Sequence, residues 1–285
     1  MIGTVVLGAL LVGCGLAVIA ALQRAIVFPA TRAMFWNPAE AGWAYRDVVL
    51  DVDGHTTHGW FIPVPRSRGV ILYSHGNGGN ISDRQAGLAI WRELGFDVLI
   101  YDYGGYGNST GKASEKRCYE DIRACWRWLV EEQKVPPLRI ALFGRSLGGA
   151  VTADLAAEVS PGAVILESTF LSAVTLGKEA FPFLPVGLLL RHRFETERKL
   201  ARCTAPILVV HSPDDDIVPY HHGNALFQLA PEPKTFLEIV GNHNEGYAET
   251  GPRYIQGLSR FLEPLFPAER GAPDSDASGG RTETP

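Results

Sequence analysis

The sequence predicts an α/β fold with a mostly parallel central sheet and helices on both of its faces. Short apolar runs of strand length alternate with segments of helical apolar spacing along most of the chain. One strand turns directly into a helix through residues 144–148. The length of 285 residues suits one large α/β domain or two small ones.

The first 22 residues are apolar and carry no charged side chain. This length suffices to cross a bilayer as a helix, so we expect residues 1–24 to be a retained, single-span membrane anchor. A cleaved signal peptide is the alternative, although a basic stretch ahead of the apolar run is missing. A lipoprotein box ending at Cys14 is a further reading, but the apolar run continues past it. Arg24 and Arg32 follow the span and favour a cytoplasmic position for the rest of the chain.

A connector over residues 25–44 precedes the predicted folded domain, residues 45–267. Residues 45–52 and 58–64 flank the turn dipeptide Asp53-Gly54 and predict an antiparallel hairpin. Further strands are predicted over residues 70–74, 98–101, 138–143, 163–166, 207–211 and 235–240. Helices are predicted over residues 83–94, 114–132 with Ser114 as N-cap, 147–159, 223–229 and 253–261. The final stretch, residues 268–285, has no large apolar residue and is predicted to be disordered.

The interval of residues 171–202 is too long for one crossover helix with its turns. It contains a very apolar stretch, residues 181–190, interrupted by Pro182 and Pro185. One interpretation is a crossover helix packed on the sheet. The other is a short cap that supplies an apolar substrate channel or touches the bilayer.

Gly144-Arg145-Ser146-Leu147-Gly148 joins the central strand to its helix. A G-x-S-x-G turn in this context is typical of a nucleophile elbow, which presents the serine hydroxyl at the edge of a sheet. The turn strains the serine backbone and requires small neighbours, a need that Gly144, Gly148 and Gly149 meet. A glycine-rich turn with an incidental serine is the alternative, but the flanking strand and helix favour Ser146 as a nucleophile.

A serine nucleophile needs a base, and the base needs an orienting acid. In this architecture the acid and then the histidine follow the serine along the chain, at the ends of later strands. His243 is the predicted base, and Asp215 is the predicted acid. Asp214 and Glu167 remain alternative acids. Three adjacent aspartates could also cap the helix that follows them.

An oxyanion hole needs hydrogen-bond donors aimed at the developing negative charge. The Leu147 N–H follows the nucleophile and is one predicted donor. The second is expected from the glycine-rich loop over residues 75–80, with Asn77 N–H first and Gly78 N–H behind it. A plain turn or a phosphate-binding loop is the alternative, but the glycine patterns of phosphate loops are absent.

Charge and cysteine content exclude other classes of function. The net charge of −5 gives no basic surface for nucleic acid. Cys14, Cys118, Cys125 and Cys203 lack the spacing of metal ligands, and a disulfide framework is not expected. No metal or organic cofactor is implied.

Five motifs together resemble the α/β-hydrolase superfamily: residues 75–77 (HGN), 102–111 (DYGGYGNSTG), 144–149 (GRSLGG), 167–170 (ESTF) and 241–244 (GNHN). More narrowly, they resemble its membrane-anchored branch, which contains the eukaryotic protein depalmitoylases and serine aminopeptidase-like relatives. The resemblance covers roughly residues 25–266. It implies the roles of nucleophile, acid and base for Ser146, Asp215 and His243, and a structural role for residues 102–111. The family's acid loop has a glycine where Ser212-Pro213 stand here, so the register of Asp214 against Asp215 stays open.

The sequence therefore predicts a membrane-bound serine hydrolase that cleaves ester or thioester bonds of lipophilic acyl substrates through an acyl-enzyme. The lipophilic preference rests on the predicted anchor and the apolar interval. A serine peptidase of the aminopeptidase type is one alternative. A non-catalytic, membrane-tethered binding module is the other. No residue pattern specifies an oligomeric state.

Overall fold

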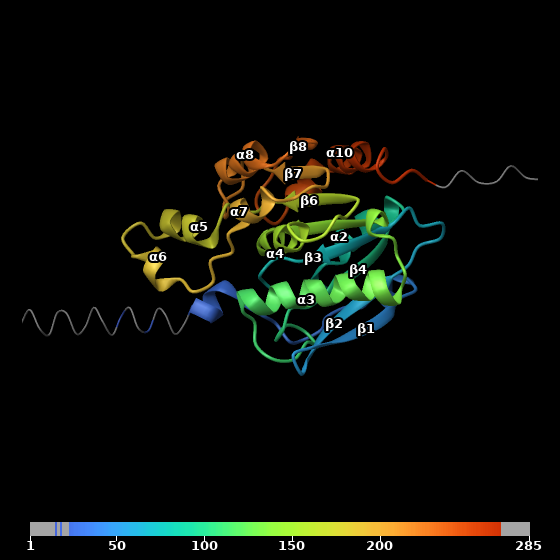
Figure 1. Cartoon of the computed structure of the whole chain (residues 1–285), viewed down its shortest axis with the longest axis horizontal. Helices are drawn as coiled ribbons and strands as arrows, with labels where there is room; N and C mark the ends of the chain where they lie inside the picture. The colour runs from blue at the N-terminus through green and yellow to red at the C-terminus, as the bar shows by residue number, and fades with distance from the viewer. Residues whose placement is uncertain (1–14, 16–17, 19–22, 269–285) are drawn as a thin grey trace, which may run out of the picture.

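Eight strands form one sheet in the order β1-β2-β4-β3-β5-β6-β7-β8 (Figure 1). The computed structural model describes residues 15, 18 and 23–268. The strands are β1 (Arg46–Val52), β2 (His55–Ile62), β3 (Val70–Ser74), β4 (Asp97–Tyr101), β5 (Ile140–Arg145), β6 (Ala163–Glu167), β7 (Ile207–His211) and β8 (Lys234–Glu238). Strands β3 to β8 are parallel, whereas β2 pairs antiparallel with β1 and β4. The predicted, mostly parallel sheet is confirmed.

Helices cover both faces of the sheet. Helices α2 to α10 have these bounds: α2 (Gln85–Glu93), α3 (Glu115–Arg127), α4 (Leu147–Ala156), α5 (Ala173–Ala180), α6 (Val186–Leu189), α7 (Thr196–Leu200), α8 (Tyr220–Leu229), α9 (Gly246–Thr250) and α10 (Pro252–Leu262). Successive strand residues point to opposite faces, so Leu72 of β3 joins the core beneath α3 and α4, while Ile71 joins the core beneath α2 and α10. Because both faces are covered, β3, β6 and β7 are buried along their whole length.

The hairpin at the start of the domain has the predicted turn. Asp53 and Gly54 both adopt a positive φ, 51° and 73°, as a two-residue hairpin turn requires. The turn pairs Val52 with His55, so β2 begins three residues earlier than predicted. Elsewhere, the Ser114 side chain accepts the Arg117 N–H and caps α3 as predicted.

Strand β8 ends two residues earlier than the sequence pattern indicated. The predicted strand extended to Val240, but the Val240 N–H donates to Thr250 Oγ1 at 2.9 Å. That bond turns the backbone towards α9 and away from the sheet. The chain therefore leaves the sheet after Glu238, and the loop that follows carries His243.

Residues 171–202 combine both structures considered for them. Helix α7 packs against α4 in the core, as a crossover helix would. Helices α5 and α6 project from one end of the molecule (Figure 1). Pro182 and Pro185 lie between them, where proline cannot continue a helix.

Two predicted segments lie mainly outside the residues that the structure describes. The predicted membrane anchor lies outside the described residues, apart from Gly15, Val18, Gln23 and Arg24. None of the helices described in the structure is long and apolar enough to cross a bilayer. The predicted disordered tail also lies outside the described residues from residue 269 onward. Cys118, Cys125 and Cys203 are buried free thiols.

Candidate active site

Ser146 occupies the turn between β5 and α4 with backbone dihedrals of φ 53° and ψ −120°. A positive φ is uncommon for a residue other than glycine and indicates a strained backbone. The Ser146 N–H donates to the Glu167 carbonyl at 2.8 Å, and the Ser146 carbonyl accepts from Thr169 Oγ1 at 2.7 Å. The end of β6 therefore holds the strained turn from both sides.

The glycines around Ser146 are required by close backbone packing. A Cβ atom on Gly148 would overlap the carbonyl oxygen of Ser74 on β3. A Cβ atom on Gly144 would overlap the carbonyl of Gly148 one turn into the helix. The prediction that this turn needs residues without bulky side chains is confirmed.

His243 and Asp215 lie in the loops after β8 and β7 and form a hydrogen-bonded chain with the serine. His243 Nε2 lies 3.0 Å from Ser146 Oγ. His243 Nδ1 lies 2.8 Å from Asp215 Oδ2 and 2.9 Å from Oδ1. Because a carboxylate only accepts, Nδ1 carries the proton, and the lone pair of Nε2 faces the serine hydroxyl. This tautomer can accept the serine proton.

Asp215 is the aspartate of the three that faces the imidazole. Its Oδ1 also accepts the Ile217 N–H at 3.0 Å and the Val218 N–H at 2.8 Å. Burial raises the pKa of Asp215, but the bonds from His243 and from these two amides outweigh burial and hold the pKa below its usual value of 3.8. The residue therefore stays a carboxylate through the neutral pH range.

The alternative acids point elsewhere. Asp214 is exposed, and its backbone N–H donates to Ser212 Oγ at 3.1 Å. Glu167 is buried 3.3 Å from Arg145 Nε and accepts a hydrogen bond from the Tyr254 hydroxyl. Neither carboxylate bonds to the His243 side chain in the described part of the chain.

The loop over residues 75–80 lies directly against the serine. A Cβ atom on Gly76 would be 3.6 Å from Ser146 Cβ. The Tyr103 hydroxyl donates to the His75 carbonyl and the Tyr106 hydroxyl to the Asn77 carbonyl, each at 2.7 Å. These tyrosines belong to the 102–111 segment, which thereby fixes the loop.

Both predicted oxyanion donors are backbone amides at this loop and at the elbow. Within the described residues, neither the Asn77 N–H nor the Leu147 N–H donates a hydrogen bond. Leu147 begins α4, where the first amides of a helix have no intrahelical partner. Both amides therefore lack an acceptor within the described residues.

Asp102 and His75 form a second buried pair beneath this loop. His75 Nε2 lies 3.4 Å from Asp102 Oδ1, and both side chains are fully buried. His75 Nδ1 lies 2.6 Å from the Gly76 carbonyl, while Asp102 Oδ1 accepts the Ile81 N–H at 3.0 Å. All of these contacts are made with residues 75–83, and none of them is made with Ser146.

The segment before the first strand also holds this loop, a role that the sequence pattern did not indicate. The Val27 carbonyl accepts from Asn77 Nδ2 at 3.3 Å. Ala30 forms a parallel bridge with Gly79, and Asn80 Nδ2 donates to the carbonyls of Thr31 at 3.0 Å and Ala33 at 2.7 Å. The predicted connector therefore contributes directly to the shape of the site.

Arg145 is a further residue that sequence reasoning did not identify. Its Nη2 donates to the carbonyls of His243 at 2.6 Å and Asn244 at 2.9 Å, while its Nε pairs with Glu167. One side chain therefore ties the elbow to the loop of the histidine. Its position immediately before the serine was the available signal.

A cavity of about 370 Å³ opens over Ser146 and His243 and is lined by the 76–79 loop and by Ile217. A second cavity of about 240 Å³ adjoins it, and the two share the side chains of Arg84 and Arg145. None of the lining residues comes from the 171–202 interval. The apolar cap considered from the sequence does not line the site in this structure.

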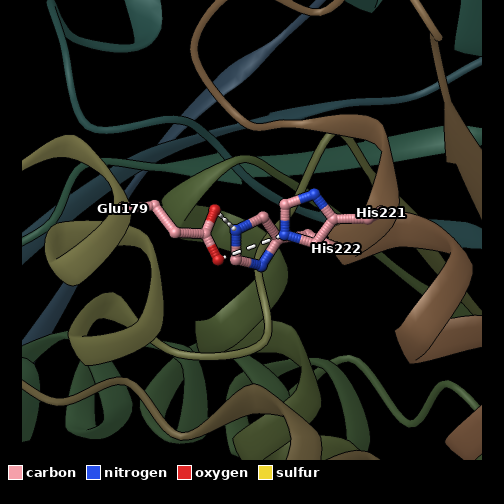
Figure 2. Close-up of side chains that lie close together, drawn as sticks. All are labelled: Glu179, His221 and His222. Atoms are coloured by element: carbon pink, nitrogen blue, oxygen red, sulfur yellow. Dashed lines mark hydrogen bonds and ion pairs between the residues drawn. The ribbon is translucent and has the colours of Figure 1, made fainter.

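Glu179, His221 and His222 form a separate cluster of possible metal ligands, whose ligand atoms lie within 4.8 Å of one another (Figure 2). Glu179 of α5 lies 3.1 Å from His221 Nε2 and 3.2 Å from His222 Nε2. The Leu171 N–H donates to His222 Nδ1 at 3.2 Å, so that nitrogen is unprotonated and the neutral ring carries its proton on Nε2. Burial lowers the pKa of His222 despite the nearby Glu179, which favours the neutral ring. A metal ion would need a lone pair on Nε2, so the cluster fits a hydrogen-bonded contact between α5 and α8 better than a metal site.

The chain is similar in sequence to known proteins. Residues 65–191 match the family model described as serine aminopeptidase, S33. An uncharacterized protein, Rv2307c of Mycobacterium tuberculosis, is 37% identical over 223 residues, which cover 77% of this chain and 79% of the relative. Human alpha/beta hydrolase domain-containing protein 17C is 34% identical over 207 residues, 71% of this chain and 60% of that protein.

The fold has solved counterparts. The structure of the Pyrococcus furiosus esterase Pf2001 superposes with a TM-score of 0.68, covering 83% of this chain and 97% of that chain at 17% identity. At that identity the likeness concerns the fold. The named sequence relative and the family model show that the chain belongs to the α/β-hydrolase superfamily, and the fold agrees with this assignment.

Proposed function

We propose that the protein is a serine hydrolase that cleaves carboxylic ester or thioester bonds of lipophilic acyl substrates. The observation that supports this proposal is the chain from Asp215 through His243 to Ser146, with 3.0 Å between His243 Nε2 and Ser146 Oγ. A serine hydroxyl becomes a competent nucleophile when an oriented base takes its proton. Ser146 is thus proposed as nucleophile, His243 as base and Asp215 as orienting acid.

The proposed reaction has two acyl-transfer steps. Ser146 Oγ attacks the substrate carbonyl as His243 Nε2 takes the hydroxyl proton, and the resulting oxyanion accepts from the Asn77 and Leu147 N–H groups. His243 then protonates the leaving alcohol or thiol, which leaves an acyl-serine. A water molecule, deprotonated by the same nitrogen, attacks the acyl-serine, and His243 returns that proton to Ser146 Oγ as the acid is released. Asp215 holds the imidazole in the required tautomer throughout.

Labelling with a fluorophosphonate probe tests the nucleophile. The full-length protein should be labelled, and Ser146→Ala should not be labelled while retaining the melting temperature of the wild type. A second serine, Ser168, has a positive φ of 47° and serves as a matched control, because Ser168→Ala should still be labelled. A folded wild-type protein that resists the probe would contradict the proposal and favour a binding module.

The family model favours one other activity, since it is described as serine aminopeptidase. Aminoacyl arylamides and p-nitrophenyl esters of increasing chain length separate the two reactions. We expect hydrolysis of the esters, with octanoyl preferred over acetyl. Turnover of the arylamides alone would establish the peptidase instead.

A further inference from the structure

The tip of the projecting α5–α6 region exposes bulky apolar side chains. Phe183 is 97% exposed, Leu188 is 89% exposed and Phe181 is 55% exposed. We call these three residues the apical patch. Burying such side chains is favourable, and apolar side chains that gather on an exposed surface often mark a site of interaction with a protein or a membrane.

The chain enters the described structure beside this patch. Gln23 is buried, its Oε1 accepts the Arg191 N–H at 2.8 Å, and its Nε2 donates to the Leu189 carbonyl at 3.5 Å. Figure 1 shows the blue helical segment at the start of the coloured chain and helices α5 and α6 at the same end of the molecule. The 22 residues that precede Gln23 contain no charged side chain. The apical patch is therefore next to the point where an uncharged, apolar segment joins the domain.

Basic side chains accompany the patch. Arg24 follows Gln23, Arg191 follows α6, and Lys178 lies near the end of α5; all three are exposed. Glu179, the nearest acid on α5, is engaged by His221 and His222. Apolar side chains beside lysine and arginine suit a bilayer surface with anionic headgroups, because the apolar groups insert while the cations pair with phosphates.

The active site is close to this end of the chain. Residues 23–27 are helical, so Val27 lies about 6 Å along the helix axis from Gln23. The Val27 carbonyl contacts Asn77 of the loop that carries a proposed oxyanion donor. A surface that binds the protein near Gln23 would therefore lie close to the active site.

We propose that the apical patch docks on an anionic lipid bilayer, inserting Phe183 and Leu188 at headgroup depth and holding the active site beside the membrane. The inference rests on the proposed function only in naming the substrate, an acyl ester or thioester borne by the lipid phase. The docking itself depends on the patch, the basic side chains and the position of Gln23.

A fluorescent label tests the docking in the full-length protein. Phe183→Cys in a Cys14→Ser background carries the environment-sensitive dye NBD, because the three described native cysteines are buried. Val49→Cys on β1, where Val49 is 61% exposed, is the matched control. On vesicles of phosphatidylcholine and phosphatidylglycerol, the dye at position 183 should shift to the blue and become protected from iodide, while the dye at position 49 should not change.

Two outcomes would overturn the docking. A dye at position 183 that stays open to iodide on vesicle-bound protein would show that the patch remains in water. A dye already protected before vesicles are added would show that the protein itself, or a second copy of it, covers the patch.

Activity then separates docking from the proposed function. Phe183→Asp with Leu188→Asp should lower hydrolysis of a vesicle-borne ester by about tenfold, since apolar insertion is lost, and leave hydrolysis of soluble p-nitrophenyl acetate unchanged. Val49→Asp with Leu138→Asp, two exposed apolar positions elsewhere, should change neither rate. Equal hydrolysis of the vesicle-borne ester by both double variants would contradict the docking. Membrane insertion of the dye in a protein that no fluorophosphonate labels would instead contradict the proposed function alone.

Discussion

Two histidine–aspartate pairs lie at the carboxyl edge of the same sheet, and they relate to Ser146 differently. His75 and Asp102 follow the neighbouring strands β3 and β4, and Asp215 and His243 follow the neighbouring strands β7 and β8. In the second pair the nearest nitrogen and oxygen are 2.8 Å apart and hydrogen bonded. In the first they are 3.4 Å apart, and the facing His75 Nε2 makes no hydrogen bond in the described structure.

The third partner of each pair accounts for the difference. The far nitrogen of His243 meets the Ser146 hydroxyl, so the imidazole can take the serine proton and return it while Asp215 stays ionised. The other nitrogen of His75 meets the Gly76 carbonyl, which cannot give or take a proton. Identical residue types at one sheet edge therefore supply a candidate base with its orienting acid in one place and a support for a loop in the other.

Replacing each of the two histidines by glutamine tests this contrast and has the largest expected effect. His243→Gln should lower kcat/KM for an ester substrate by about 10⁴-fold, since the base is lost, and leave the melting temperature unchanged. His75→Gln should lower the melting temperature, because it disturbs a fully buried ring. Steady-state kinetics and thermal unfolding measure both. An unchanged kcat/KM in the His243→Gln variant would show that His243 is not the base.

The aspartates provide a smaller and sharper contrast. Asp215→Asn should lower kcat by about 10³- to 10⁴-fold because an amide cannot hold the imidazole in the same tautomer. The exposed neighbour variant, Asp214→Asn, should stay within about twofold of the wild type. The reverse order of the two effects in the same kinetic assay would assign the orienting role to Asp214.

Asp102 should affect stability more than turnover. Asp102→Ala leaves the buried Ile81 N–H without its acceptor, which should lower the free energy of unfolding by about 1–3 kcal/mol. Urea unfolding gives this value, and active-site titration gives the turnover of the folded fraction. A loss of turnover as large as that of Asp215→Asn, with unchanged stability, would make the two pairs functionally alike.

The smallest expected effect is on the pH dependence of stability. The hydrogen bonds from His243, Ile217 and Val218 hold the folded-state pKa of Asp215 below 3.8. The stability that this carboxylate contributes is therefore complete above its unfolded-state pKa and is lost as the pH falls through the lower, folded-state value. The difference in unfolding free energy between the wild type and Asp215→Asn should shrink below about pH 4. A difference that grows on acidification would reverse the assigned direction.

The local pattern of apolar residues and motifs in the sequence was sufficient to predict much of the fold and the residues of the candidate triad. Apolar runs of strand length placed β3 to β8 to within a few residues, and the chain order of serine, acid and histidine identified Ser146, Asp215 and His243, which the structure brings together. The pattern favoured Asp215 but left Asp214 open as the acid. Periodicity does not show that the amides of Ile217 and Val218 turn the Asp215 carboxylate inward.

Contacts between distant segments were beyond the sequence pattern. Arg145 reaches carbonyls 98 and 99 residues away, and Val27 contacts a loop 50 residues later. Nothing in the local spacing of either residue encodes such a partner. The position of α5 and α6 away from the cavities also depends on tertiary packing rather than on their apolar composition.

The bonds between residues 27–33 and the 77–80 loop place part of the frame of the candidate site outside the sheet. A protein shortened to begin at Arg46 would include the sequence of all eight strands and of the Ser146 turn, but it would lack Phe28 of the buried core. It would lose the carbonyls of Val27, Thr31 and Ala33, on which the Asn77 and Asn80 side chains are held. The family match, which begins at residue 65, would place the boundary later still. Domain limits drawn from sequence similarity would thus separate the candidate active site from residues that hold it in shape.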